Sequence, residues 1–166
     1  MEIIQFLVLS LLLFSAVQGL VIGLFMFIRN RGNRLANVAL GFLLFTFGLS
    51  ALDVWLLRVQ WFENALHVYH LPFWFTLSFG PLFFYHVKFS LFPIYQFRPT
   101  DFKHLILPVM QFVLVFSIGL QAPENQYQIW QDFIRPYYGP IEYALFFSFF
   151  LCVFVACLSV RAVSKC

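Results

Sequence analysis

The chain has 166 residues, of which 62% are hydrophobic and 10% are charged, whereas an ordinary soluble domain has about 45–50% apolar and about 25% charged residues. One water-soluble core cannot bury so much apolar surface, so the composition excludes a soluble enzyme or DNA-binding domain and predicts an integral membrane protein. The net charge of +3 is too small and too scattered to indicate nucleic-acid binding, and we expect no nucleic-acid partner for this chain.

Five apolar runs are long enough to cross a bilayer as helices, because a hydrocarbon core of about 30 Å takes about 20 apolar residues. The first run resembles a signal peptide only loosely, since it lacks a basic start and its arginines follow it, so we expect it to be retained. We predict an all-α integral membrane protein, a bundle of five transmembrane helices forming a single membrane domain over residues 1–166. The predicted spans are residues 3–28, 35–57, 71–92, 105–120 and 140–160.

Small residues recur at four-residue spacing on one face of the first and of the last predicted helix. Such faces let two helix backbones approach closely. The partner of each face is another helix of this chain, another membrane subunit, or a second copy in a homodimer, and the pattern does not choose among them. The residues are Ser15, Gly19 and Gly23 in the first helix and Ala144, Ser148, Cys152 and Ala156 in the last.

The third predicted helix contains the dipeptide Gly80-Pro81. Proline lacks a backbone N–H and its ring clashes with the preceding turn, so it kinks helices. We therefore expect a hinge at Gly80 and Pro81.

Basic residues predict the orientation, because Lys and Arg concentrate in cytoplasmic loops. With five spans, eight of the ten basic residues fall on one side, and only Arg58 and Arg135 fall on the other. The N-terminus is therefore expected outside and the C-terminus in the cytoplasm, in a multi-pass protein of the plasma (inner) membrane. The four tryptophans cluster toward the outer ends of the runs, as an interfacial aromatic belt requires.

Polar residues near the expected outer face are candidates for a ligand or input surface, because ionisable groups in a membrane are costly and often functional. Asp53 lies near this interface, where a local hydrogen bond or a pair with Arg58 is the alternative to a ligand or proton site. Glu142 lies in the first turn of the last helix, where a carboxylate also complements the helix dipole. The candidates are Asp53, Arg58, His67, His70, Trp130 and Glu142.

Histidine pairs offer little for a metal or haem site. His67 and His70 stand three residues apart, but a metal would need a further ligand, and we predict no metal. A bis-histidine haem would need His86 and His104 deeper in the bundle, so haem or pigment lacks support and we predict no cofactor beyond lipid contacts. Catalytic signatures such as G-x-S-x-G, H-E-x-x-H and phosphate-binding loops do not occur, and we expect no enzyme activity.

Three motifs resemble a known family. Residues 33–37 (NRLAN), 79–85 (FGPLFFY) and 97–108 (FRPTDFKHLILP) are similar, in order and spacing, to the N-terminal multi-span region of membrane-anchored bacterial AraC-type transcriptional regulators. The resemblance covers roughly residues 18 to 120 and implies a sensor module that passes a signal to a cytoplasmic helix-turn-helix domain. That DNA-binding domain is not present among these residues.

Two classes of function follow. In the first, the chain is a sensory or signal-transducing membrane module without a DNA-binding or catalytic part, whose input surface comprises Asp53, residues 58–70 and residues 121–138. In the second, it is a small non-catalytic accessory or structural subunit of a larger membrane complex, packed on partners through its Phe-rich and small-residue faces. A helix-turn-helix encoded in frame beyond Cys166 would favour the first class.

Overall fold

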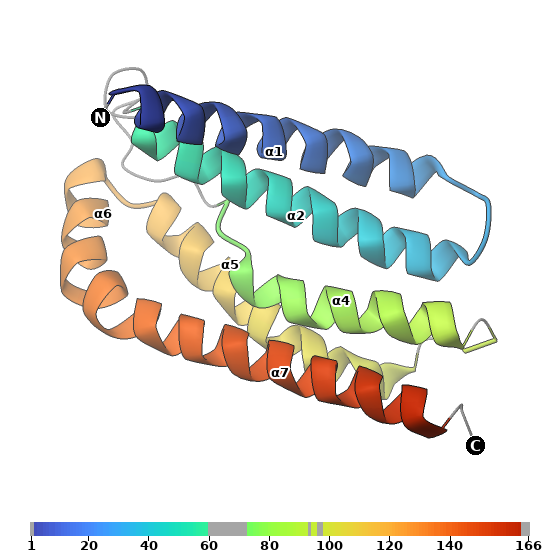
Figure 1. Cartoon of the computed structure of the whole chain (residues 1–166). Coiled ribbons are helices and arrows are strands. Elements are labelled where there is room, and N and C mark those ends of the chain that lie inside the picture. The colour runs from blue at the N-terminus through green and yellow to red at the C-terminus, as the bar shows by residue number, and fades with distance from the viewer. Residues whose placement is uncertain (1, 60–72, 93, 96–97, 164–166) are drawn as a thin grey trace.

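The computed structural model describes residues 2–59, 73–92, 94–95 and 98–163, and within these ranges it does not describe the side chains of residues 2, 153, 154 and 156–163. The described chain is all-helical, which confirms the predicted class (Figure 1). Its long helices are α1 (Glu2–Ile28), α2 (Arg34–Arg58), α4 (Thr76–Leu91), α5 (Ile106–Gly119) and α7 (Gly139–Val163). Shorter elements are the 3-10 helix η1 (Pro99–Leu105), α6 (Pro123–Ile129) and the π-helix η2 (Trp130–Tyr138).

Among the described residues, three helical segments are long and apolar enough to cross a membrane: Ile3–Ile28, Arg34–Arg58 and Pro99–Gly119. The five predicted spans are therefore supported only in part. The third predicted span differs most, because α4 has 16 residues, or about 24 Å of helix, against a hydrocarbon core of about 30 Å. Residues 71 and 72 lie outside the described residues, and Phe73–Phe75 are not helical.

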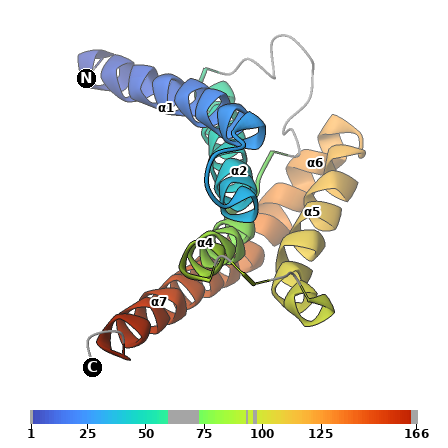
Figure 2. The same ribbon diagram turned by 90° about the vertical axis from the view of Figure 1, so that its right-hand side faces the viewer.

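The long helices run alternately up and down (Figure 1). At one end, here called the turn end, lie the turn of residues 29–33, the end of α4 and η1; the opposite end, called the α6 end, holds α6 and the last residues of α2 (Figure 1). α1 packs on α2, α2 packs on α4, and α4 also contacts α5 and α7. Viewed along the helices in Figure 2, α4 lies between the α1–α2 pair and helices α5 and α7. The helices form an open arrangement rather than a closed ring (Figure 2).

Glycines make the close contact between α1 and α2. A Cβ atom on Gly48 would lie 2.8 Å from the backbone nitrogen of Leu20 and 2.9 Å from the carbonyl oxygen of Ala16. A Cβ on Gly19 would lie 2.9 Å from the Leu44 carbonyl oxygen, and one on Gly23 would be equally close to α2. The small face predicted on the first helix therefore packs on α2 of the same chain, whereas Ser15 is half-buried and bonds the Leu11 carbonyl of its own helix.

The small face of α7 has a different environment. Ala144, Ser148 and Cys152 are exposed, and the side chain of Ala156 lies outside the described residues. Large apolar side chains elsewhere on α7 are exposed too, Phe147 by 63% and Leu151 by 63%. This face therefore has no partner among the described elements of the chain.

Gly80 and Pro81 lie inside α4 and are both buried. A Cβ atom on Gly80 would overlap the ring of Phe149 on α7. The absence of a side chain at Gly80 thus permits close packing of α4 on α7. This packing role is separate from the hinge expected at Gly80 and Pro81.

Candidate functional site

Gln111 is the centre of a buried polar group that we call the Gln111 cluster, formed by Gln111, Glu142, Thr76 and Trp74. Gln111 and Glu142 are each 2% exposed. Gln111 Nε2 donates to Glu142 Oε1 at 2.8 Å and to Thr76 Oγ1 at 3.1 Å, and Trp74 Nε1 donates to the same Thr76 oxygen at 3.0 Å. Polar contacts of this kind join helices where apolar surfaces supply no directional bond.

The cluster surrounds the start of α4, which lies inside the bundle rather than at its end (Figure 1). Gln111 Oε1 accepts a hydrogen bond from the backbone N–H of Leu77 at 2.9 Å, one of the N–H groups that a helix start leaves without an internal partner. Ser50 on α2 secures the preceding residues, donating to the Phe73 carbonyl at 3.1 Å and accepting from the Phe75 N–H at 3.3 Å. Protein groups thus satisfy backbone atoms of the non-helical residues that precede α4.

Two buried polar atoms at the cluster, Glu142 Oε2 and the Tyr138 hydroxyl, have no hydrogen-bond partner among the described residues. Burial raises the pKa of Tyr138 to about 12, and the neighbouring Glu142 carboxyl adds to the rise, so the hydroxyl keeps its proton and can donate. Buried polar atoms in native proteins nearly always have a partner. The site therefore has one acceptor and one donor available to a small polar group.

Of the remaining input candidates, Trp130 contacts the cluster. Its ring lies beside that of Trp74, with the ring centroids 5.0 Å apart and the two planes tilted by 44°. Asp53 is 5% exposed, and its buried Oδ1 has no hydrogen-bond partner within the part of the chain that the structure describes. Arg58 is exposed and makes no ion pair with Asp53, while His67 and His70 lie outside the described residues.

A second polar group, the Asp101 cluster, fixes the other end of α4. Asp101 is 5% exposed, and its carboxylate accepts from Lys88 Nζ at 2.9 Å, the Tyr95 hydroxyl at 2.8 Å and the Arg98 N–H at 2.9 Å. Tyr85 donates to the Asp101 carbonyl oxygen, and Lys88 Nζ lies 4.0 Å from the centre of the Tyr95 ring. These contacts join η1 to the last turns of α4.

Asn33 ties the turn between α1 and α2 to α4. Its Oδ1 caps α2 by accepting from the backbone N–H groups of Leu35 at 3.0 Å and Ala36 at 3.5 Å. Its Nδ2 donates to the Phe89 carbonyl oxygen at 2.6 Å. Gly32 precedes it with φ +80, a left-handed conformation that glycine adopts without steric cost. The NRLAN motif thus begins with a residue that caps one helix and holds another.

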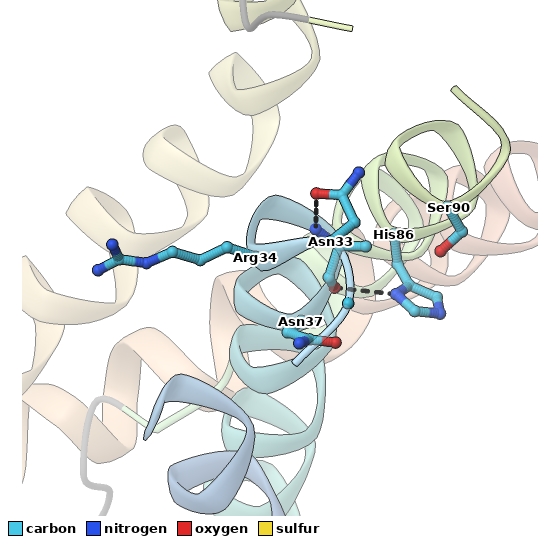
Figure 3. A pocket seen from close by; sticks show the side chains of 7 residues that line it. Asn33, Arg34, Asn37, His86 and Ser90 are labelled. Carbon is cyan, nitrogen blue, oxygen red and sulfur yellow. Dashed lines mark hydrogen bonds between the residues drawn. The ribbon is translucent and has the colours of Figure 1, made fainter. Parts of the chain in front are cut away.

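An open cavity of about 630 Å³ lies beside this turn (Figure 3). His86 Nδ1 is 2.9 Å from the Ala36 carbonyl oxygen, and because a carbonyl only accepts, Nδ1 is the donor. Arg34 extends from the turn in the opposite direction to His86 and Ser90 (Figure 3). The cavity is lined by Gly32, Asn33, Arg34, Ala36, Asn37, His86 and Ser90.

Metal or cofactor ligands do not gather in the described residues, where no three His, Cys, Asp or Glu side chains lie close enough to hold an ion. His86 is bound to Ala36, and His104 packs with its ring centre 5.3 Å from that of Phe84. The chemistry that the described side chains offer is hydrogen bonding and ion pairing at the two ends of α4.

Sequence reasoning did not find the Asp101 cluster or the glycines of α2. Asp101 stands out only as an acidic residue in a basic segment, and its role depends on Lys88, 13 residues away. Gly41 and Gly48 are seven residues apart, a spacing that also returns to one helix face, so a search at seven as well as four residues would have identified them.

No model of a known protein family matches the chain, and neither does any curated protein or solved structure. The resemblance to membrane-anchored AraC-type regulators accordingly rests on the three sequence motifs.

Proposed function

We propose that the protein is a membrane-embedded, non-catalytic signal-transducing module, similar to the input region of membrane-anchored AraC-type regulators. In this proposal it crosses the bacterial inner membrane several times, with the N-terminus outside and the C-terminus in the cytoplasm. The α6 end then faces outward and the turn end faces the cytoplasm. The composition and the three membrane-length apolar segments support membrane insertion.

The observation that carries the proposal is that polar contacts hold both ends of one short central helix. Gln111 on α5 bonds the first turn of α4, and Glu142 on α7 bonds Gln111. At the opposite end, Lys88 and Tyr85 of α4 bond Asp101 in η1. A change in the Gln111 and Glu142 contacts should therefore move α4 relative to Asp101 in η1, because α4 transmits the movement as a rigid helix.

The input surface is proposed at the α6 end, where Glu142 Oε2, the Tyr138 hydroxyl and Asp53 Oδ1 are buried with no hydrogen-bond partner among the described residues. A ligand or partner that bonds these atoms in one arrangement of α4 and not in another shifts the balance between the arrangements. Asp53 and Trp130 belong to the same proposed surface.

Distance measurements between spin labels test the coupling. Labels at Ser90 in α4 and Thr100 in η1, both exposed, report the separation of the end of α4 from η1 in reconstituted vesicles, after the three native cysteines are replaced by serine. Glu142→Ala removes the contact to Gln111 at the far end, and we expect the label distance to shift or broaden by about 1–2 Å, the scale of helix shifts in signalling proteins.

Glu142→Gln is the matched control, because its amide oxygen still accepts from Gln111 and the distance should not change. Unchanged distances in both Glu142→Ala and Gln111→Leu would overturn the proposal, since the ends of α4 would then be uncoupled. Circular dichroism of each variant identifies any that fail to fold.

A second candidate function, an accessory subunit of a larger membrane complex or a homodimer, is favoured by the exposed small face of α7. Ala144, Ser148 and Cys152 are exposed and match the pattern by which membrane helices associate. Oxidation in native membranes should cross-link Cys152 to a partner or a second copy, and Ser148→Leu should abolish the cross-link. Absence of any Cys152 cross-link would count against this candidate.

A further inference from the structure

The turn between α1 and α2 carries three arginines, Arg29, Arg31 and Arg34, whose side chains are exposed. None of them makes an ion pair with a described residue. Asp101, the acidic residue described at this end of the bundle, has both carboxylate oxygens bonded by Lys88, Tyr95 and the Arg98 N–H. The positive charge of the turn is therefore not neutralised within the described part of the protein.

The arginines project from a backbone that is held in place. Asn37 Nδ2 donates to the carbonyl oxygens of Arg29 at 3.3 Å and Arg31 at 2.8 Å. Asn33 Nδ2 holds the same turn to the Phe89 carbonyl of α4. These bonds fix the backbone from which the arginine side chains extend, so a bound ligand does not have to order a flexible loop.

Space for a ligand lies on both sides of the turn. One side has the cavity of about 630 Å³ walled by His86 and Ser90 (Figure 3). The other side has an open cavity of about 620 Å³ lined by Phe25, Ile28, Arg29, Asn30 and Arg31. Phe25 is 61% exposed and Ile28 76% exposed, so apolar surface adjoins the cationic groups directly.

We propose that this turn, with its flanking cavities, is a binding site for an anionic phospholipid. Guanidinium groups bind phosphate through paired N–H donors, and basic pockets between membrane helices hold anionic headgroups. Phe25 and Ile28 contact the acyl chains in the cavity that they line together with Arg29 and Arg31, whose guanidinium groups bind the phosphate. The juxtaposition of arginines with exposed apolar surface selects a lipid over a soluble phosphate compound, which has no use for the apolar surface. The inference rests on the proposed membrane insertion and not on signal transmission.

Native mass spectrometry of the full chain in detergent micelles tests the site, with phosphatidylglycerol as probe and phosphatidylcholine as zwitterionic reference. We expect bound phosphatidylglycerol to exceed phosphatidylcholine by more than about tenfold, since each Lys or Arg near an anionic lipid surface favours binding about fivefold. Equal binding of the two lipids would overturn the proposal.

Combined replacement Arg29→Gln, Arg31→Gln and Arg34→Gln should remove the preference. The matched control replaces Arg58→Gln and Arg135→Gln, two exposed arginines at the α6 end, and should keep it. The lysine version of the triple variant retains the charge and should restore most of the preference, which separates loss of binding from misfolding. A preference that survives in the glutamine variant would overturn the site.

A competition arm distinguishes lipid from soluble anion. Glycerol 3-phosphate at millimolar concentration should leave the bound phosphatidylglycerol unchanged, and its displacement of the lipid would show that a soluble phosphate compound is the ligand. The readout is lipid binding alone, so it succeeds or fails independently of the spin-label distances that test signal transmission.

Discussion

Gln111 and Glu142 are joined by a hydrogen bond of 2.8 Å between Nε2 and Oε1, with both side chains 2% exposed. The bond connects α5 to α7 across the first turn of α4, and Gln111 also bonds the Leu77 N–H. The amide of Gln111 on α5 thus bonds polar atoms of α4 and α7. It joins three helices that otherwise meet through apolar surfaces.

Replacement of this amide should destabilise the bundle. Gln111→Leu leaves the Leu77 N–H, Glu142 Oε1 and Thr76 Oγ1 without a bond from residue 111, so we expect the free energy of unfolding to fall by about 1–3 kcal/mol. Gln18→Leu is the matched control, because Gln18 is exposed on α1 and its loss should cost little. Thermal unfolding in detergent would measure both, and equal effects would contradict the assigned role of Gln111.

Lys88 and Asp101 form an ion pair, and their contributions to the free energy of unfolding should be coupled. Its two side chains are 21% and 8% exposed, and Nζ lies 2.9 Å from Oδ1. Removing one partner leaves a partly buried charge without its counter-ion, so Lys88→Met and Asp101→Asn should each destabilise, and the double variant should lose less than their sum. A double-mutant cycle of unfolding free energies measures the coupling. Strict additivity would show that the pair contributes nothing beyond its separate members.

Gly48→Ala should disrupt the α1–α2 contact. The added Cβ would lie 2.8 Å from the backbone nitrogen of Leu20, and backbone cannot move aside as a flexible side chain does. We expect a loss of about 1–3 kcal/mol, as for other overpacked sites. Gly139→Ala is the control, since the nearest atom there is 3.4 Å away. The two variants can be compared by unfolding of the isolated proteins, and a loss in the control alone would reverse the argument.

Gly80→Ala separates packing from hinge motion. The added methyl group would overlap the Phe149 ring, so the variant should be destabilised, and Phe149→Leu in the same chain should restore part of the stability. A hinge predicts a different outcome, because a helix made stiffer at residue 80 would not recover when its neighbour is made smaller. Unfolding measurements of the single and double variants distinguish the two roles.

Sequence patterns predicted the helical class and the close approach of α1 to another helix, because both follow from local spacing. The late start of α4 was not predictable from hydropathy, since the apolar run continues through Phe73–Phe75. α4 begins only at Thr76 because the residues around its start bond to Ser50 and Gln111, which lie 23 to 35 positions away in the sequence. The Asp101 cluster was missed for the same reason, as none of its members is distinctive without the fold.

The glycine-packed pair α1 and α2 has consequences for biosynthesis. α1 packs on α2, with its nearest backbone contacts supplied by residues that precede α4 in the chain, so this hairpin is complete as soon as its two helices have been made. The first turn of α4, by contrast, needs Gln111 and, through it, Glu142, which are translated later. Under the proposed membrane insertion, the N-terminal hairpin enters the bilayer as a finished unit, while α4 reaches its native environment only when the last helix has been synthesised.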